Sequence, residues 1–135
     1  MAALTISFKV WHPTLRAEEI ADQLRLDAQH VFNVGEQRKT PSGRDLEGVH
    51  ETSFVCVKFF QGDQALLSEE ISSWVGQLGR NADYLRMIVS SGGELVLHLV
   101  LLVENMVDFY IDNDLIVQLA AIGIGLSFSL YEQTR

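Results

Sequence analysis

The first ten residues of the chain alternate between apolar and polar side chains. Leu4, Ile6, Phe8 and Val10 are separated by Thr5, Ser7 and Lys9. An alternation with a period of two predicts a strand with one buried face. Pro13 ends this strand, and Thr14 is suited to cap the helix that follows.

That helix is indicated by apolar residues at helical spacing, namely Ala17, Ile20, Ala21 and Leu24. A short apolar piece, Val31 to Val34, predicts a second strand. Residues 35–51 are polar and contain Pro41, Gly43 and Gly48, so we expect a mobile surface loop there.

Phe54 to Phe60 predicts a third strand that is apolar on both faces, except at Lys58. Such a run is typical of a central strand covered on both sides, or of a strand covered by an oligomer partner.

The second half of the chain predicts two more helices and three more strands. One helix follows Asp63 and ends at Gly79, and its apolar stripe is Leu67, Ile71, Trp74 and Leu78. We predict a hairpin of two strands, Leu85 to Ser90 and Glu94 to Val103, joined by Ser91-Gly92-Gly93. The last elements are a helix over 115–122, capped by Asp112 or Asn113, and a strand over 126–130.

The predicted order β-α-β-β-α-β-β-α-β favours an α+β domain with one sheet. We expect a ferredoxin-like β-α-β-β-α-β core, extended by a C-terminal β-α-β. In this prediction the helices pack on one face of a mainly antiparallel sheet.

Length and composition suit one domain over residues 1–135. The first residues do not resemble a signal peptide, and the apolar stretch 95–103 is too short to span a membrane. The single Cys56 excludes an internal disulfide, as is typical of a reducing compartment. We therefore expect a cytoplasmic protein without a membrane partner.

The net charge is −8, and residues 87–134 contain no Lys or Arg. Because phosphate backbones would be repelled by this half of the chain, we expect no nucleic-acid partner. The acidic charge suits a basic partner protein, or it serves solubility alone.

The sequence contains no recognisable catalytic motif. The four histidines lack the spacing of a metal site, and no nucleophile elbow or phosphate-binding glycine loop occurs. Cys56 lies in mid-strand between valines, where a buried thiol is expected. We predict no catalytic residue, no metal and no cofactor, and hence no enzyme.

The candidate binding residues are Trp11, His12, Arg38, Lys39 and Arg44. The three basic residues form the one local concentration of positive charge, which can hold an anion or a partner's carboxylates. Trp11 lies on the polar face of its strand, as an interface anchor would. The alternative is a solvated loop tip.

The chain resembles the family known as domain of unknown function 4279, which is found mainly in bacteria. The resemblance covers nearly the full chain and rests on the strand over 6–10, Gly35-Glu36, the amphipathic helix over 66–78 and the ending over 119–131. Two positions depart from the family, which tends to carry Trp at Phe54 and an acidic residue at Ser129. The resemblance implies a small α+β domain without an established activity, and it supplies no catalytic residues.

Three functions remain open. The first is a non-catalytic protein-interaction module, homodimeric through an apolar sheet face or edge. The second is an immunity-type inhibitor whose acidic surface masks a basic toxin. The third is a small-molecule-binding domain that uses the 36–50 loop.

Overall fold

The computed structural model describes residues 3–106 and 108–132 of the chain. In chain order, its elements are β1 (Ala3–His12), α1 (Ala17–Leu24), β2 (His30–Phe32), β3 (Gln37–Lys39), β4 (Asp45–Val49), β5 (Ser53–Asp63), the 3-10 helix η1 (Gln64–Leu66), α2 (Leu67–Gly79), α3 (Ala82–Ser90), β6 (Glu94–Val103), α4 (Asn113–Ile122) and β7 (Ile124–Glu132).

A five-stranded sheet with the order β2-β5-β1-β6-β7 forms the centre of the molecule. β1 pairs antiparallel with β5 on one side and with β6 on the other, and β2 pairs antiparallel with β5. β7 runs parallel to β6, after a crossover through α4. The sheet is therefore mixed, with its parallel pair at one edge.

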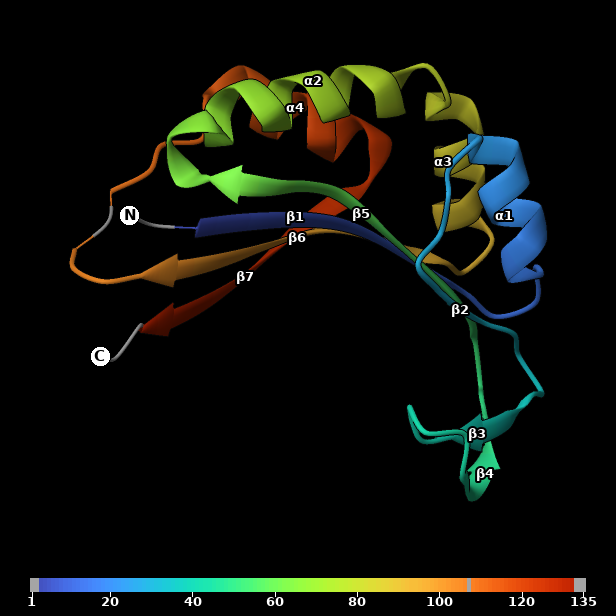
Figure 1. Ribbon diagram of the computed structural model, residues 1–135. Helices are drawn as coiled ribbons and strands as arrows, with labels where there is room; N and C mark the ends of the chain where they lie inside the picture. The colour runs from blue at the N-terminus through green and yellow to red at the C-terminus, as the bar shows by residue number, and fades with distance from the viewer. Residues whose placement is uncertain (1–2, 107, 133–135) are drawn as a thin grey trace.

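The helices cover one face of the sheet and leave the other face open (Figure 1). The covered side of β1 is fully buried and consists of Leu4, Ile6, Phe8 and Val10. Its open side is only half-buried and consists of Thr5, Ser7, Lys9 and Trp11. The alternation predicted for this strand is confirmed, and it reflects a sheet that is covered on one face only.

The first helix begins without the cap predicted from Thr14. Its N-cap position is Arg16, whose side chain makes no capping hydrogen bond. The buried side chain of Asn33 instead accepts a hydrogen bond from the backbone N–H of Ala17, at 2.6 Å. The cap of α1 thus comes from the segment that follows β2.

Residues 82–90 form helix α3, so the strand predicted for Leu85 to Ser90 is wrong. Leu85 and Ile88 are buried three residues apart, which is a helical spacing. The Ser91-Gly92-Gly93 segment therefore joins a helix to β6. A Cβ atom at Gly93 would lie 2.7 Å from the backbone oxygens of Ile88 and Trp11, so this close approach requires glycine.

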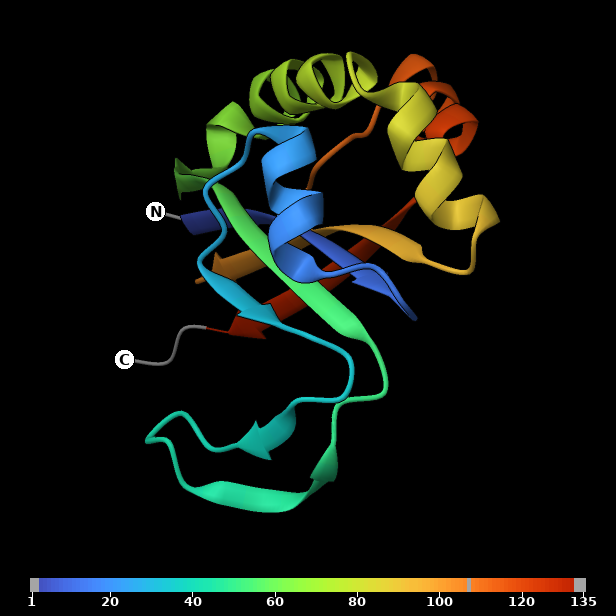
Figure 2. The ribbon, with the colours of Figure 1, turned by 90° about the vertical axis from the view of Figure 1, so that its right-hand side faces the viewer.

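The loop predicted over residues 35–51 is also wrong, because most of it is a β-hairpin. β3 pairs antiparallel with β4, and Gly43 in the connecting turn has a φ of 89°. The hairpin projects from one end of the sheet (Figure 2), and every residue of its two strands is exposed. Since neither face is buried, the sequence carries no alternation that would reveal these strands.

The fold is α+β, with four α-helices and a mainly antiparallel sheet in the described residues. This agrees with the predicted class, an α+β domain with a mainly antiparallel sheet. Within the same residues, no helix is both long enough and apolar enough to span a bilayer.

Candidate functional site

His12 is an internal residue that holds the end of β1. Its side chain is 2% exposed. Nδ1 accepts hydrogen bonds from the backbone N–H groups of Thr14, at 3.1 Å, and Leu15, at 3.0 Å, and Nε2 lies 2.8 Å from the hydroxyl oxygen of Ser91. Burial lowers the pKa of His12. This geometry describes a buried ring that ties β1 to the end of α3.

The basic residues Arg38, Lys39 and Arg44 lie on the exposed hairpin. Arg38 donates to the backbone oxygen of Glu47 at 3.1 Å, and Lys39 lies 3.9 Å from the carboxylate of Asp45. In the described part of the chain, no hydrogen bond, ion pair or ring contact joins these side chains to Trp11 or His12. Two of the three basic groups thus have partners within the hairpin itself.

Trp11 belongs to a row of rings, the aromatic row, on the open face. Its ring centroid lies 5.1 Å from that of Phe54, its cross-strand partner on β5. Phe54 stacks with Phe32 of β2, again at 5.1 Å, and Phe32 stacks with His50 at 3.6 Å. The row spans three strands and ends at the base of the hairpin. The aromatic row results from the register in which the strands pair, and no local sequence pattern predicts that register.

A polar group lies farther along the same open face. His98 of β6 contacts the hydroxyl groups of Ser127, 2.9 Å from Nδ1, and Ser129, 3.4 Å from Nε2. Burial, and then the charge of Lys9, lowers the pKa of His98. Both ring nitrogens of His98 therefore face hydroxyl groups of β7.

Cys56 lies on β5, and β1 separates it from His98. Burial raises the pKa of its thiol, although Lys9 and a hydrogen bond with Ser7 act in the opposite direction. A raised thiol pKa opposes the thiolate that a nucleophile needs. In the residues for which the structure gives positions, no three His, Cys, Asp or Glu side chains gather in a way that would hold a metal ion.

The outer edge of β7 is the feature that sequence reasoning missed. β7 is the last strand of the sheet and, among the residues that the structure describes, pairs only with β6, so within them its other edge presents unpaired backbone groups. Residues 124–131 contain no charged side chain. Phe128, Leu130 and Tyr131 are 41%, 63% and 57% exposed. The lack of charge in this segment is visible in the sequence. Its position at the edge of the sheet is not.

One further apolar side chain contacts this edge strand from the segment before α4. Phe109 stacks with Phe128, with ring centroids 5.5 Å apart, and is itself 38% exposed. Such an edge can pair with a strand of another chain and bury apolar side chains as it does so.

Comparison with known proteins gives one family. The family described as "Domain of unknown function (DUF4279)" matches residues 2–133 of the 135-residue chain. No curated protein and no solved structure matches the chain. Because the match covers nearly the whole sequence, the chain belongs to the DUF4279 family, as its resemblance had predicted.

Proposed function

We propose that this chain is a non-catalytic protein-interaction module whose partner is a second copy, bound edge to edge along β7. The observation that carries the proposal is the outer edge of β7, which is uncharged over the eight residues 124–131. Natural edge strands are normally protected by charge, proline or a covering element. β7 has no charge or proline over residues 124–131, so its edge is suited to pairing.

Charge favours a second copy at this edge over contact elsewhere. With a net charge of −8, two copies repel each other wherever their acidic surfaces meet. The outer edge of β7 lacks charge over residues 124–131, so two copies can approach there about a two-fold axis. Antiparallel pairing of the two β7 strands would satisfy the free backbone groups and cover Leu130 and Tyr131.

A non-catalytic role is supported by the chemistry of the open face. The Cys56 thiol is shifted toward its protonated form, and His98 contacts two serine hydroxyls. β1 separates the two side chains, so they do not form a nucleophile–base pair.

The test is the effect of one added charge on the molar mass in solution. We expect the parent protein to elute as a dimer at micromolar concentration in size-exclusion chromatography with light scattering. Leu130→Glu places an unpaired carboxylate in the proposed contact, at a cost of about 3 kcal/mol, or roughly 100-fold in affinity. Val117→Glu on α4 is the matched control, because Val117 is 57% exposed and Leu130 63%.

A monomeric Leu130→Glu protein beside a dimeric Val117→Glu protein would support the proposal. Far-ultraviolet circular dichroism confirms that both variants are folded. A monomeric parent, or a Leu130→Glu protein as dimeric as the control, would exclude the β7 dimer.

A second candidate function is the immunity-type inhibitor, favoured by an acidic groove between α2 and α4. This groove has a volume of about 520 Å³, and its lining includes Glu69, Asp112, Asp114 and Tyr110. Three carboxylates around a tyrosine suit a basic protein surface. This function is tested by titration with basic proteins encoded beside the gene, at low and at high salt concentration. An affinity that does not change with salt concentration would contradict it.

We also propose a ferredoxin-like core of β1, β2, β5 and β6, in which β6 takes the place of the strand predicted over residues 85–90. The order β2-β5-β1-β6 supports it, because β1 and β2 both run antiparallel to the strand between them.

A further inference from the structure

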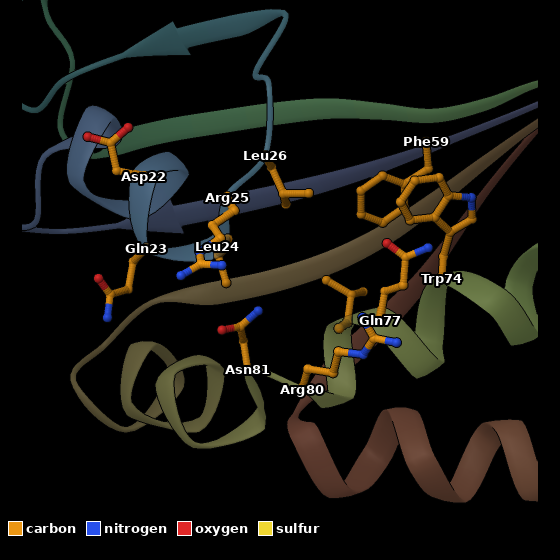
Figure 3. A pocket seen from close by; sticks show the side chains of 11 residues that line it. Asp22, Gln23, Leu24, Arg25, Leu26, Phe59, Trp74, Gln77, Arg80 and Asn81 are labelled. Carbon is orange, nitrogen blue, oxygen red and sulfur yellow. The ribbon is translucent and has the colours of Figure 1, made fainter.

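A cleft opens between the C-terminal end of α1 and the corner where α2 meets α3 (Figure 3). Its volume is about 620 Å³. Small-molecule sites typically measure about 300–1,000 Å³. The cleft lies on the helical side of the sheet, so it is separate from both the open face and the basic hairpin.

Two arginines line this cleft without partners of their own. Arg25 directly follows α1 and Arg80 directly follows α2, and both are exposed. Neither side chain makes a hydrogen bond or ion pair with another residue that the structure describes. Asp22 also lines the cleft, but Figure 3 shows its carboxylate turned away from the two guanidinium groups.

The backbone of Arg25 adopts a left-handed conformation that is unfavourable for a residue other than glycine. Its φ is 55° and its ψ is 45°, and no other described non-glycine residue has a positive φ. Glycine is the usual residue at this position after a helix. A basic residue in the last turn of α1 would complement the helix dipole without that cost, but the last turn has none. The strained position instead sets the guanidinium beside the cleft.

An aromatic wall closes the other end of the cleft. Trp74 stacks on Phe59 with ring centroids 4.1 Å apart and an interplanar angle of 7°. The indole N–H donates to the Glu70 carboxylate at 3.2 Å, which fixes the orientation of the ring. The wall is therefore ordered before any ligand arrives. Gln77 adds an amide donor beside the wall, and Asn81 adds one toward Arg25 (Figure 3).

We propose that this cleft binds a small organic anion with a flat apolar body. The guanidinium groups of Arg25 and Arg80 hold the anionic group, a carboxylate or a phosphate, through charge-assisted hydrogen bonds. The apolar body lies against Trp74 and Leu26. This site is independent of pairing through β7.

The test is a titration followed by the fluorescence of Trp74, in a Trp11→Phe background that leaves it as the only tryptophan. The probes are phenylacetate and phenyl phosphate, with phenethylamine as the cationic analogue, and with acetate and inorganic phosphate as anions without a ring. We expect one of the two aromatic anions to bind at least about tenfold more tightly than phenethylamine, acetate or inorganic phosphate. The preferred anion identifies the chemical group that the arginines hold.

Three variants locate the site. Arg25→Gly and Arg80→Ala should each weaken binding by about tenfold or more, the usual loss for a charge-assisted hydrogen bond. Arg25→Gly should at the same time raise the melting temperature, so lost binding cannot be ascribed to lost fold. Arg38→Ala removes the same charge from the hairpin and should leave binding unchanged.

The proposal is overturned if neither aromatic anion binds at millimolar concentration, or if phenethylamine binds equally well. Unchanged binding in Arg25→Gly would also overturn it. Weakening by Arg38→Ala alone would place the anion on the hairpin.

Discussion

The buried imidazole of His12 makes the stability of this protein depend on pH. Because Nδ1 accepts two backbone N–H groups, it carries no proton, and Nε2 donates to Ser91. Protonation would add a third N–H to this cluster of donors and place a charge in the interior. Burial accordingly lowers the pKa of His12 from the ordinary value of 6.5.

The direction of the pH effect follows from that lowered pKa. Below about pH 6.5 the unfolded chain binds a proton at His12 that the folded chain does not. The contribution of His12 to the free energy of unfolding is therefore complete above pH 6.5. It is lost as the pH falls from there toward the pKa of the folded state. The slope for one proton is at most about 1.4 kcal/mol per pH unit.

Replacing His12 by alanine tests the same hydrogen bonds directly. The change leaves the N–H groups of Thr14 and Leu15 without their acceptor, at about 1 kcal/mol each. Thr14 is exposed and Leu15 half-buried, so water replaces part of the loss. With the cavity left by the ring, we expect a total loss of about 2–4 kcal/mol.

Urea unfolding between pH 5.5 and 8 measures both effects, with His30→Ala as the control. His30 is an exposed histidine, and its replacement should change the free energy of unfolding by less than about 0.5 kcal/mol. His98 contributes a slope of the same sign, because burial lowers its pKa too. The reasoning is refuted if His12→Ala costs no more than His30→Ala, or if it leaves the pH slope of the parent unchanged.

Two further substitutions test buried polar groups. The hydroxyl of Tyr84 is buried and, among the described atoms, unpartnered, so Tyr84→Phe should raise the free energy of unfolding by about 1 kcal/mol in urea unfolding. The Asn33 side-chain amide donates to the carboxylates of Glu18 and Glu36 and accepts from Ala17. Asn33→Asp keeps the acceptor but sets three carboxylates together, so it should lower stability by about 3 kcal/mol at pH 7 and by less at pH 4. An equal loss at both pH values would contradict this account.

The elements that the sequence predicted correctly are those with one clearly buried face. β1 alternates over its whole length, and α2 and α4 each bury a stripe at helical spacing. The strand prediction for residues 85–90 failed because a segment of six residues that contains Ile88 and Val89 fits the period of a helix as well as that of a strand. The hairpin failed for the opposite reason, since an element without a buried face has no pattern to detect.

Strand geometry explains why the predicted binding residues Trp11 and His12 do not lie in one site. Trp11 and His12 are neighbours on β1, and neighbouring side chains of a strand point to opposite faces. One therefore joins the aromatic row on the open face, and the other enters the interior. The cleft escaped prediction because Arg25 and Arg80 are far apart in sequence and come to line one cleft only in the folded chain.

Because helices cover only one face of the sheet, the outer edge of β7 is better suited to binding a partner chain than the centre of the open face is. A sheet face without cover must be compatible with water, and the middle of this face carries Ser7, Lys9, His98 and Ser127. Burying those groups against another chain would require a hydrogen-bond partner for each of them. At β7 the free groups belong to the backbone of a strand, and a second strand satisfies all of them with one regular ladder. A protein of this charge can therefore gain a neutral contact at that edge without desolvating its polar face.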